Sequence, residues 1–206
     1  MSQANTLPIE DLESIAARVS ATSHKPLVDG VIFALSFRAG LRACEMAGVR
    51  WRDVLASTGD VVLPGKMWRV PDNVAKKNSG RPIPMHPDLY TALVRARAAL
   101  PAAAVTPEKP LVLRSVPLTG VIDPRYVGVG ANTLQRYISR RFKNIGLVGV
   151  TSHSGRRTFL TDLARRATQH NCSLRDVMKL AGHRQIETTE RYVELSDGVG
   201  NLVVSA

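Results

Sequence analysis

Four short segments of the sequence contain residues that could act together on a phosphate group. They read GLRACE (40–45), AKKNSGRPIP (75–84), HSGR (153–156) and GHRQIETTERY (182–192). Arginine and lysine side chains can hold the charge of a phosphate, a tyrosine hydroxyl can attack the phosphorus, and a lysine or histidine can transfer protons. The four segments therefore supply the side chains that phosphoryl transfer needs when no metal ion takes part.

Sequence patterns that hold metals or nucleotides are absent. The chain has no Walker loop, no HExxH, no paired CxxC and no acid pair of the kind that holds two magnesium ions. If this protein acts on nucleic acid, we expect it to use no metal and no other cofactor.

The first segment offers an ion pair on a short helix. Arg42 and Glu45 lie three residues apart, a spacing that brings two helical side chains together. Such pairs are common on surfaces, where they contribute little. Apolar neighbours such as Leu41 and Met46 indicate that part of this helix is covered, and a covered arginine without a partner would be costly. We therefore expect Arg42 and Glu45 to pair.

The second segment presents two adjacent lysines between short β-prone stretches. Lys76 and Lys77 fall in the polar turn KKNSG (76–80). If they belong to a strand, its alternation sends their side chains to opposite faces. The sequence alone leaves open which of the two could reach a phosphate.

The third segment lies at the start of a predicted helix. Arg156 falls on the same helical stripe as Leu160 and Leu163, so it should point toward the core, whereas Arg157 can face water. An arginine on an apolar stripe needs an anion or an acid in front of it. The alternative is a histidine at a helix start, His153, followed by an arginine that reaches out to solvent.

The fourth segment fits two interpretations. Residues 173–193 could form a helix-turn-helix that reads DNA, because a helix is followed by a glycine-containing turn and a polar second helix. Glu187 and Glu190 argue against this, since both would face phosphates and repel them. In the other interpretation, His183 and Tyr192 belong to a reaction centre.

The elements that must position these residues are mainly helical. Apolar residues recur at helical spacing over 7–20, 27–37, 86–100 and 132–145, a short helix is expected between Gly40 and Val49, and two or three more between about 155 and 195. The stretches 61–71 and 81–85 predict a small antiparallel sheet, 108–115 one further strand, and 117–131 a long loop. We expect a single domain over 1–206, mainly α with a small antiparallel β-sheet (α+β).

The charge of the chain favours a polyanionic partner. The net charge is +11, and eight lysines and arginines stand against one acid, Asp162, between Thr133 and His170. Two cysteines without metal-ligand spacing, no signal peptide and no long apolar run indicate a cytoplasmic protein that does not enter a membrane. We expect its partner to be nucleic acid rather than a small molecule.

Together, the four segments resemble those of the tyrosine recombinases, also called phage integrases. Members of this family carry an arginine in a Gly-Leu-Arg-x-x-Glu segment, a lysine on a β-hairpin and a His-x-x-Arg box. A Gly-His pair follows, with the nucleophilic tyrosine nine residues after the histidine. The resemblance extends from about Leu7 to Leu195 and rests on four motifs in the right order. It implies the recombinase catalytic-domain fold and site-specific cleavage and rejoining of DNA.

The resemblance also implies a role for each site residue. Tyr192 would form a 3′-phosphotyrosyl bond and release a 5′-hydroxyl, while Arg42, Arg156 and His183 would hold the non-bridging oxygens. His153 would help to accept the tyrosine proton, and a hairpin lysine would protonate the leaving oxygen. The family lysine usually precedes a proline by eight residues, which selects Lys76 from Pro84 and leaves Lys77 as the alternative. Glu45 would orient Arg42.

Typical members also carry an amino-terminal DNA-clamping domain of about a hundred residues, and nothing in this sequence could supply it. The resemblance implies a homo-tetramer assembled on DNA, and the apolar end of the tail (196–206), Leu202 to Val204, is a candidate contact between protomers. Two alternatives remain at this stage: relaxation of DNA like that of a type IB topoisomerase, and a non-catalytic helix-turn-helix regulator.

Overall fold

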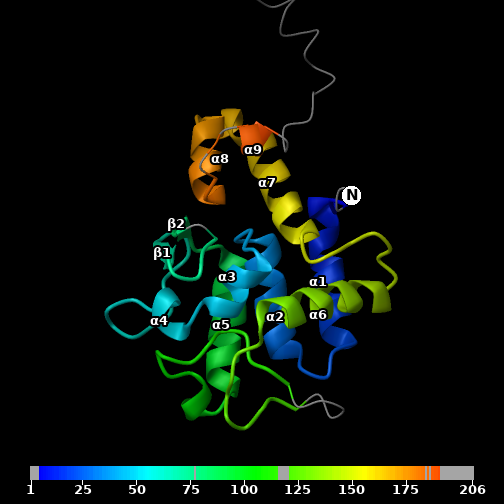
Figure 1. Cartoon of the computed structure of the whole chain (residues 1–206), viewed down its shortest axis with the longest axis vertical. Helices are drawn as coiled ribbons and strands as arrows, with labels where there is room; N and C mark the ends of the chain where they lie inside the picture. The colour runs from blue at the N-terminus through cyan, green and yellow to red at the C-terminus, as the bar shows by residue number, and fades with distance from the viewer. Residues whose placement is uncertain (1–4, 77, 116–120, 184, 186, 191–206) are drawn as a thin grey trace, which may run out of the picture.

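The computed structural model describes residues 5–76, 78–115, 121–183, 185 and 187–190. It is mainly helical with one two-stranded antiparallel sheet, as predicted (Figure 1). The helices are α1 (Leu12–Ala21), α2 (Pro26–Phe37), α3 (Ala43–Gly48), α4 (Trp51–Val54), α5 (Pro87–Ala99), α6 (Ala131–Asn144), α7 (Ser154–Arg166), α8 (Leu174–Ala181) and α9 (Glu187–Glu190), and the strands are β1 (Met67–Val70) and β2 (Arg81–Pro84).

Helix α2 is the centre of the larger hydrophobic core. Its sequence is apolar on nearly every face, and the helix is accordingly buried among α1, α5 and α7. Phe33 and Phe37 stack on each other with ring centroids 4.5 Å apart, and Phe37 meets Phe142 of α6 edge to face. The segment that follows α2 directly, 38–42, therefore starts from a rigid support.

The hairpin presents one buried face to the core. Trp68 pairs with Ile83 across the two strands, and both side chains are buried. Because side chains alternate along a strand, Arg81 lies on the same face as Ile83, and its exposed fraction is only 4%. The sheet thus directs an arginine, and not only apolar groups, into the interior.

A second, smaller hydrophobic cluster joins α7 to α8. It consists of Leu160, Ala167, Val177 and Ala181, with Phe159, Leu163 and Leu174 packed against it. In Figure 1, α8 lies beside the carboxyl-terminal part of α7, with α9 close by, away from the larger core. The hairpin and the start of α3 are on the side of the larger core that faces α8.

The secondary structure differs from the predicted one at three places. The strand expected over 108–115 is wrong: this segment makes only isolated bridges, such as Leu113 with Gly128, because Pro110 lacks an N–H and the partner segment is a loop rather than a strand. Helix α4 was not predicted, since four residues are too few for a periodic pattern. Residues 9–11 form a 3-10 turn ahead of α1.

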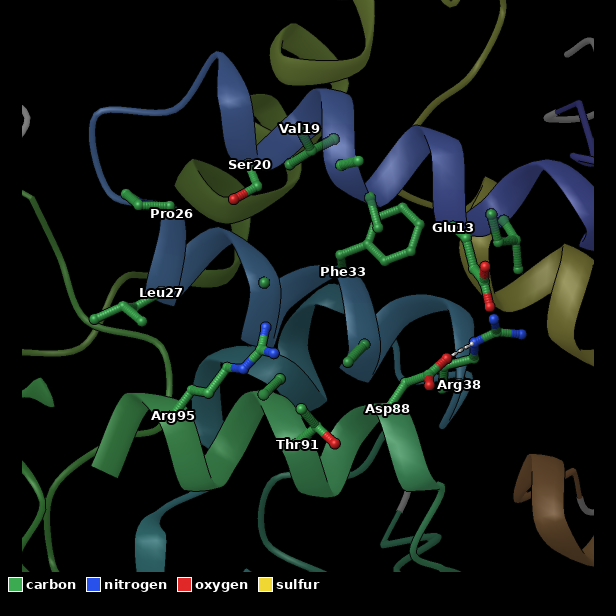
Figure 2. A pocket seen from close by; sticks show the side chains of 16 residues that line it. Glu13, Val19, Ser20, Pro26, Leu27, Phe33, Arg38, Asp88, Thr91 and Arg95 are labelled. Atoms are coloured by element: carbon green, nitrogen blue, oxygen red, sulfur yellow. Dashed lines mark ion pairs between the residues drawn. The ribbon is translucent and has the colours of Figure 1, made fainter. Parts of the chain in front are cut away.

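A groove of about 470 Å³ lies between α1 and α5, with α2 beneath it (Figure 2). Its walls are mostly apolar, and an ion pair between Arg38 and Asp88, 2.8 Å apart, stands at one end. None of the residues that line it belongs to the four segments identified above. Within the described part of the chain, no helix is long and apolar enough to cross a membrane.

Candidate active site

A hollow of about 340 Å³ gathers residues from three of the four segments. It is lined by Arg42, Lys76, Ser79, Gly182, His183, Gln185 and Thr188. These residues come from the start of α3, from the turn before β2 and from the segment after α8. Because α3 and β2 pack with the larger core and α8 with the smaller cluster, the hollow lies where the two hydrophobic clusters meet.

Arg42 and Glu45 form the expected ion pair and also start helix α3. The Arg42 Nη1 donates to Glu45 Oε1 at 2.9 Å, and the Arg42 backbone N–H donates to Oε2 at the same distance. Glu45 is fully buried, whereas the Arg42 side chain is 22% exposed. The pair therefore fixes the base of the Arg42 side chain and leaves part of its guanidinium at the hollow.

Arg81 is a second partner of Glu45 that was not predicted from the sequence. Its Nη1 and Nη2 donate to the two carboxylate oxygens at 2.9 and 3.1 Å, and its Nε donates to the carbonyl of Leu180 at 2.6 Å. Burial acts to raise the pKa of Glu45, but the hydrogen bonds and charge of Arg81 outweigh it, so this pKa lies below its ordinary value. Arg81 and Glu45 thus link β2 to the start of α3, and Arg81 also links both to the end of α8.

Arg156 points into the interior, as its place on the apolar stripe of α7 predicts. It is 5% exposed, whereas Arg157 is only partly buried. The Arg156 Nη1 donates to the carbonyl of Gly40 at 2.7 Å, and Nη2 donates to the carbonyl of Ala181 and contacts His183 Nε2 at 3.0 Å. These partners are dipoles, and the charge of Arg156 also reaches Glu45, whose pKa it helps to lower.

His183 is held by the turn that ends α8. Gly182 adopts a left-handed conformation, with φ at +62°, and a Cβ there would lie 3.0 Å from the Ser79 carbonyl oxygen, so glycine is needed for conformation and for space. The His183 ring contacts Arg156 through Nε2 and the Thr189 hydroxyl through Nδ1, at 2.9 Å. Burial, with the charges of Arg156 and Arg42, lowers the pKa of His183 to about 4, so the ring is neutral near pH 7.

The remaining candidates have different positions. Lys76 is exposed and lines the hollow. It lies in a turn, where its backbone carbonyl accepts a hydrogen bond from the Ser79 hydroxyl, so the alternation of side chains along a strand does not apply to it. His153 is exposed, precedes α7 directly and is not among the residues that line the hollow. Lys77 and Tyr192 lie outside the described residues. The structure thus brings Arg42, Lys76, Arg156 and His183 together.

The basic stretch between Thr133 and His170 is divided between surface and interior. Arg141 and Arg156 point inward, and Arg141 reaches Asp29 at 3.2 Å. The exposed members are Arg136, Arg140, Lys143, Arg165 and Arg166. Most of the excess positive charge in this stretch therefore lies on the surface, on α6 and at the end of α7.

Comparison with known proteins gives consistent matches over almost the whole chain. Residues 5–198 match the model of the phage integrase family. The chain is 28% identical over 178 residues to the tyrosine recombinase XerC of Corynebacterium glutamicum, and 26% identical over 171 residues to that of Syntrophus aciditrophicus. These matches cover 86% and 82% of this chain but 50% of each relative, so the chain spans about half the length of the curated relatives it matches.

Solved structures with the same fold are also recombinases. The integrase of the Tn1549 transposon, in complex with circular intermediate DNA, superposes with a TM-score of 0.71 at 17% identity, covering 100% of this chain and 67% of that one. XerA recombinase gives 0.61 at 17% identity, with 100% and 64% covered. XerH, bound to its difH substrate, gives 0.66 at 16% identity, with 97% and 53% covered.

Proposed function

Because the chain belongs to the phage integrase family, we propose that it acts as a site-specific recombinase, which cleaves and rejoins double-stranded DNA through a 3′-phosphotyrosyl intermediate. The observation that carries this proposal is the hollow where Arg42, Lys76 and His183 meet, with Arg156 bonded to His183. Two cationic side chains and an imidazole around one space, with the third cation bonded to that imidazole, suit a phosphodiester, whose non-bridging oxygens gain charge during substitution.

In this proposal two arginines hold the scissile phosphate. Planar guanidinium groups match the spacing of two phosphate oxygens and remain charged at every relevant pH. Arg42 is fixed by Glu45 and partly exposed at the hollow, so it can contact one oxygen without being reorganised. Arg156 is fixed by two backbone carbonyls, and His183 supplies a further hydrogen bond.

The bond changes require a nucleophile, a base and an acid. The hydroxyl oxygen of Tyr192 attacks the phosphorus, its proton passes to a base for which His153 is the candidate, and the bond from phosphorus to the 5′-oxygen breaks. Lys76, or alternatively Lys77, gives its proton to that oxygen, which leaves as a 5′-hydroxyl. Rejoining reverses these steps with another 5′-hydroxyl, so the phosphotyrosyl bond conserves the energy, and neither ATP nor a metal ion is needed.

We also propose that the protein works as a tetramer assembled on DNA. Exchange of strands between two duplexes requires four cleavages, and therefore four active sites. The candidate contact between protomers, Leu202 to Val204, lies outside the described residues. The exposed basic residues of α6 and of the end of α7 support binding of the duplex, because each cation near a phosphate releases a counterion.

A suicide substrate tests the proposed function. We would incubate the protein, in excess EDTA and without nucleotide, with duplexes of randomised central sequence that carry a nick one nucleotide beyond each potential cleavage site. Cleavage then releases a fragment too short to rejoin, and the protein stays attached to the labelled 3′ end. The proposal predicts a protein–DNA adduct that resists denaturation. No adduct at any sequence, or an adduct that requires magnesium, would contradict it.

A further inference from the structure

The contacts of His183 fix which of its ring nitrogens carries the proton. Arg156 Nη2, 3.0 Å from His183 Nε2, has only N–H donors, so Nε2 must accept this hydrogen bond. The ring is neutral near pH 7, so its one proton is on Nδ1. Nδ1–H then donates to the Thr189 hydroxyl oxygen, 2.9 Å away.

This arrangement is the reverse of what a bound phosphate requires. A phosphate oxygen only accepts hydrogen bonds, so His183 can bond it through Nε2 only when Nε2 carries a proton. A neutral ring that protonates Nε2 must give up the proton on Nδ1, and Nδ1 then needs a donor in place of an acceptor. The partner at Nδ1 decides whether this change is possible inside the protein.

Thr189 can serve both states of the ring. A hydroxyl both accepts and donates hydrogen bonds, whereas a carboxylate or a backbone carbonyl only accepts, and would hold the ring as Nδ1–H. Thr189 is fully buried, so its hydroxyl stays in place at Nδ1, while the half-buried His183 ring can exchange protons with solvent. It lies on α9, so the helix that precedes Tyr192 in the sequence also carries the partner of His183.

We propose that Thr189 is a positioning residue, whose hydroxyl holds the His183 imidazole through Nδ1 before and after the ring changes tautomer. When the hollow is empty, Nδ1–H donates to the hydroxyl. When a phosphate is bound, its oxygens accept hydrogen bonds from Arg156 Nη2 and from Nε2–H. Nδ1 has then lost its proton to solvent, Nε2 has gained one from solvent, and the hydroxyl donates to Nδ1, so the charge of the ring does not change. The second state rests on the proposed function, and the first does not.

Two substitutions separate the hydroxyl from the bulk of the side chain. Thr189→Val removes the hydroxyl and keeps the shape, while Thr189→Ser keeps the hydroxyl. The matched control is Thr161→Val, because Thr161 is also buried and lies on α7, outside the hollow. Loss of one hydrogen bond to a neutral group corresponds to an effect of roughly tenfold, so we expect Thr189→Val to slow cleavage about tenfold, and Thr189→Ser and Thr161→Val to stay close to wild type.

Nitrogen NMR of histidine-labelled protein reads the tautomer without any DNA. His183→Gln assigns the His183 signals among the five histidines. The free wild type should show a protonated Nδ1 and a bare Nε2, inorganic phosphate added as the probe should shift the ring toward a protonated Nε2, and Thr189→Val should disturb both nitrogens. Unchanged nitrogens in Thr189→Val, or an equal loss of cleavage in Thr161→Val, would overturn the proposal. If the wild type forms no DNA adduct but Thr189→Val still disturbs the nitrogens, the contact stands and the proposed function fails.

Discussion

Arg81 donates hydrogen bonds to both carboxylate oxygens of Glu45, and neither side chain is more than 4% exposed. The two residues are 36 positions apart in the sequence and belong to the hairpin and to α3. Glu45 also accepts a hydrogen bond from the Arg42 side chain. Arg81 also donates a hydrogen bond to the carbonyl of Leu180, two residues before Gly182. The position of the candidate phosphate-binding groups therefore depends on one buried ion pair that does not itself line the hollow.

The first prediction concerns this pair. Glu45→Gln leaves Arg81 buried without its counter-charge, and breaking a buried pair typically lowers the free energy of unfolding by about 3–5 kcal/mol. The control is Glu108→Gln, which removes an ion pair with Arg52 whose side chains are 67% and 50% exposed, and should cost less than about 1 kcal/mol. Urea denaturation of both variants measures the difference. Equal losses would show that the buried pair contributes nothing special.

A second prediction separates the arginines of α7. Arg42→Ala and Arg156→Ala should each slow cleavage by about 10²–10³, the scale seen when one donor to a transition state is removed. Arg157→Ala should have a far smaller effect, because Arg157 is less buried than Arg156 and does not line the hollow. Since Arg156 also bonds two carbonyls, thermal denaturation must show that the variant is folded. Equal effects of Arg156→Ala and Arg157→Ala on cleavage would refute the assignment.

The third prediction identifies the acid. Lys76→Ala should slow cleavage of an ordinary duplex, but not of a duplex whose leaving 5′-oxygen is replaced by sulfur, because a thiolate leaves without protonation. Lys77→Ala should have little effect on either substrate. Adduct formation on matched pairs of suicide duplexes measures both. If sulfur rescues Lys77→Ala instead, Lys77 is the acid; if it rescues neither, the hairpin lysines do not protonate the leaving group.

A fourth prediction concerns pH. The pKa of His183 is about 4 in the folded protein, against an ordinary value of 6.5. Between these two values the unfolded chain binds a proton that the folded protein does not, so stability should fall as the pH drops from 6.5 to 4. The variant His183→Gln should lack this contribution and lose less stability over that window. Urea titrations at several pH values compare the two proteins, and parallel curves would mean that the His183 pKa is not lowered.

The sequence predicted the hairpin and the helices other than α4 because their residue patterns are local. It predicted the Arg42–Glu45 pair because a separation of three residues is local, although Arg42 is the extended residue that precedes α3 and does not lie within the helix. Arg81 was missed although a signal existed: alternation from Ile83 places it on the buried face. Its partners could not be inferred, because Glu45 and Leu180 come close to it only through packing of the two hydrophobic clusters.

The role of Thr189 was equally hidden from the sequence. Threonine is common on a polar helix, so its presence there predicts no contact with His183. Only the folded structure, in which Arg156 contacts Nε2 of the His183 ring, shows that Nδ1 faces Thr189. The strand that was wrongly predicted over 108–115 shows a different limit of prediction from the sequence. An apolar run such as Leu111 to Leu113 is buried as expected, but its pairing depended on a partner segment that forms a loop.

Mapping of the adduct tests the central claim most directly. We would digest the adduct with protease and nuclease and locate the remaining nucleotide by mass spectrometry. The account predicts that it lies on Tyr192, and that Tyr192→Phe forms no adduct while binding DNA nearly as the wild type does, because only the attacking oxygen is lost. An adduct on Tyr90, Tyr126, Tyr137 or any other residue, or one that persists in Tyr192→Phe, would contradict it.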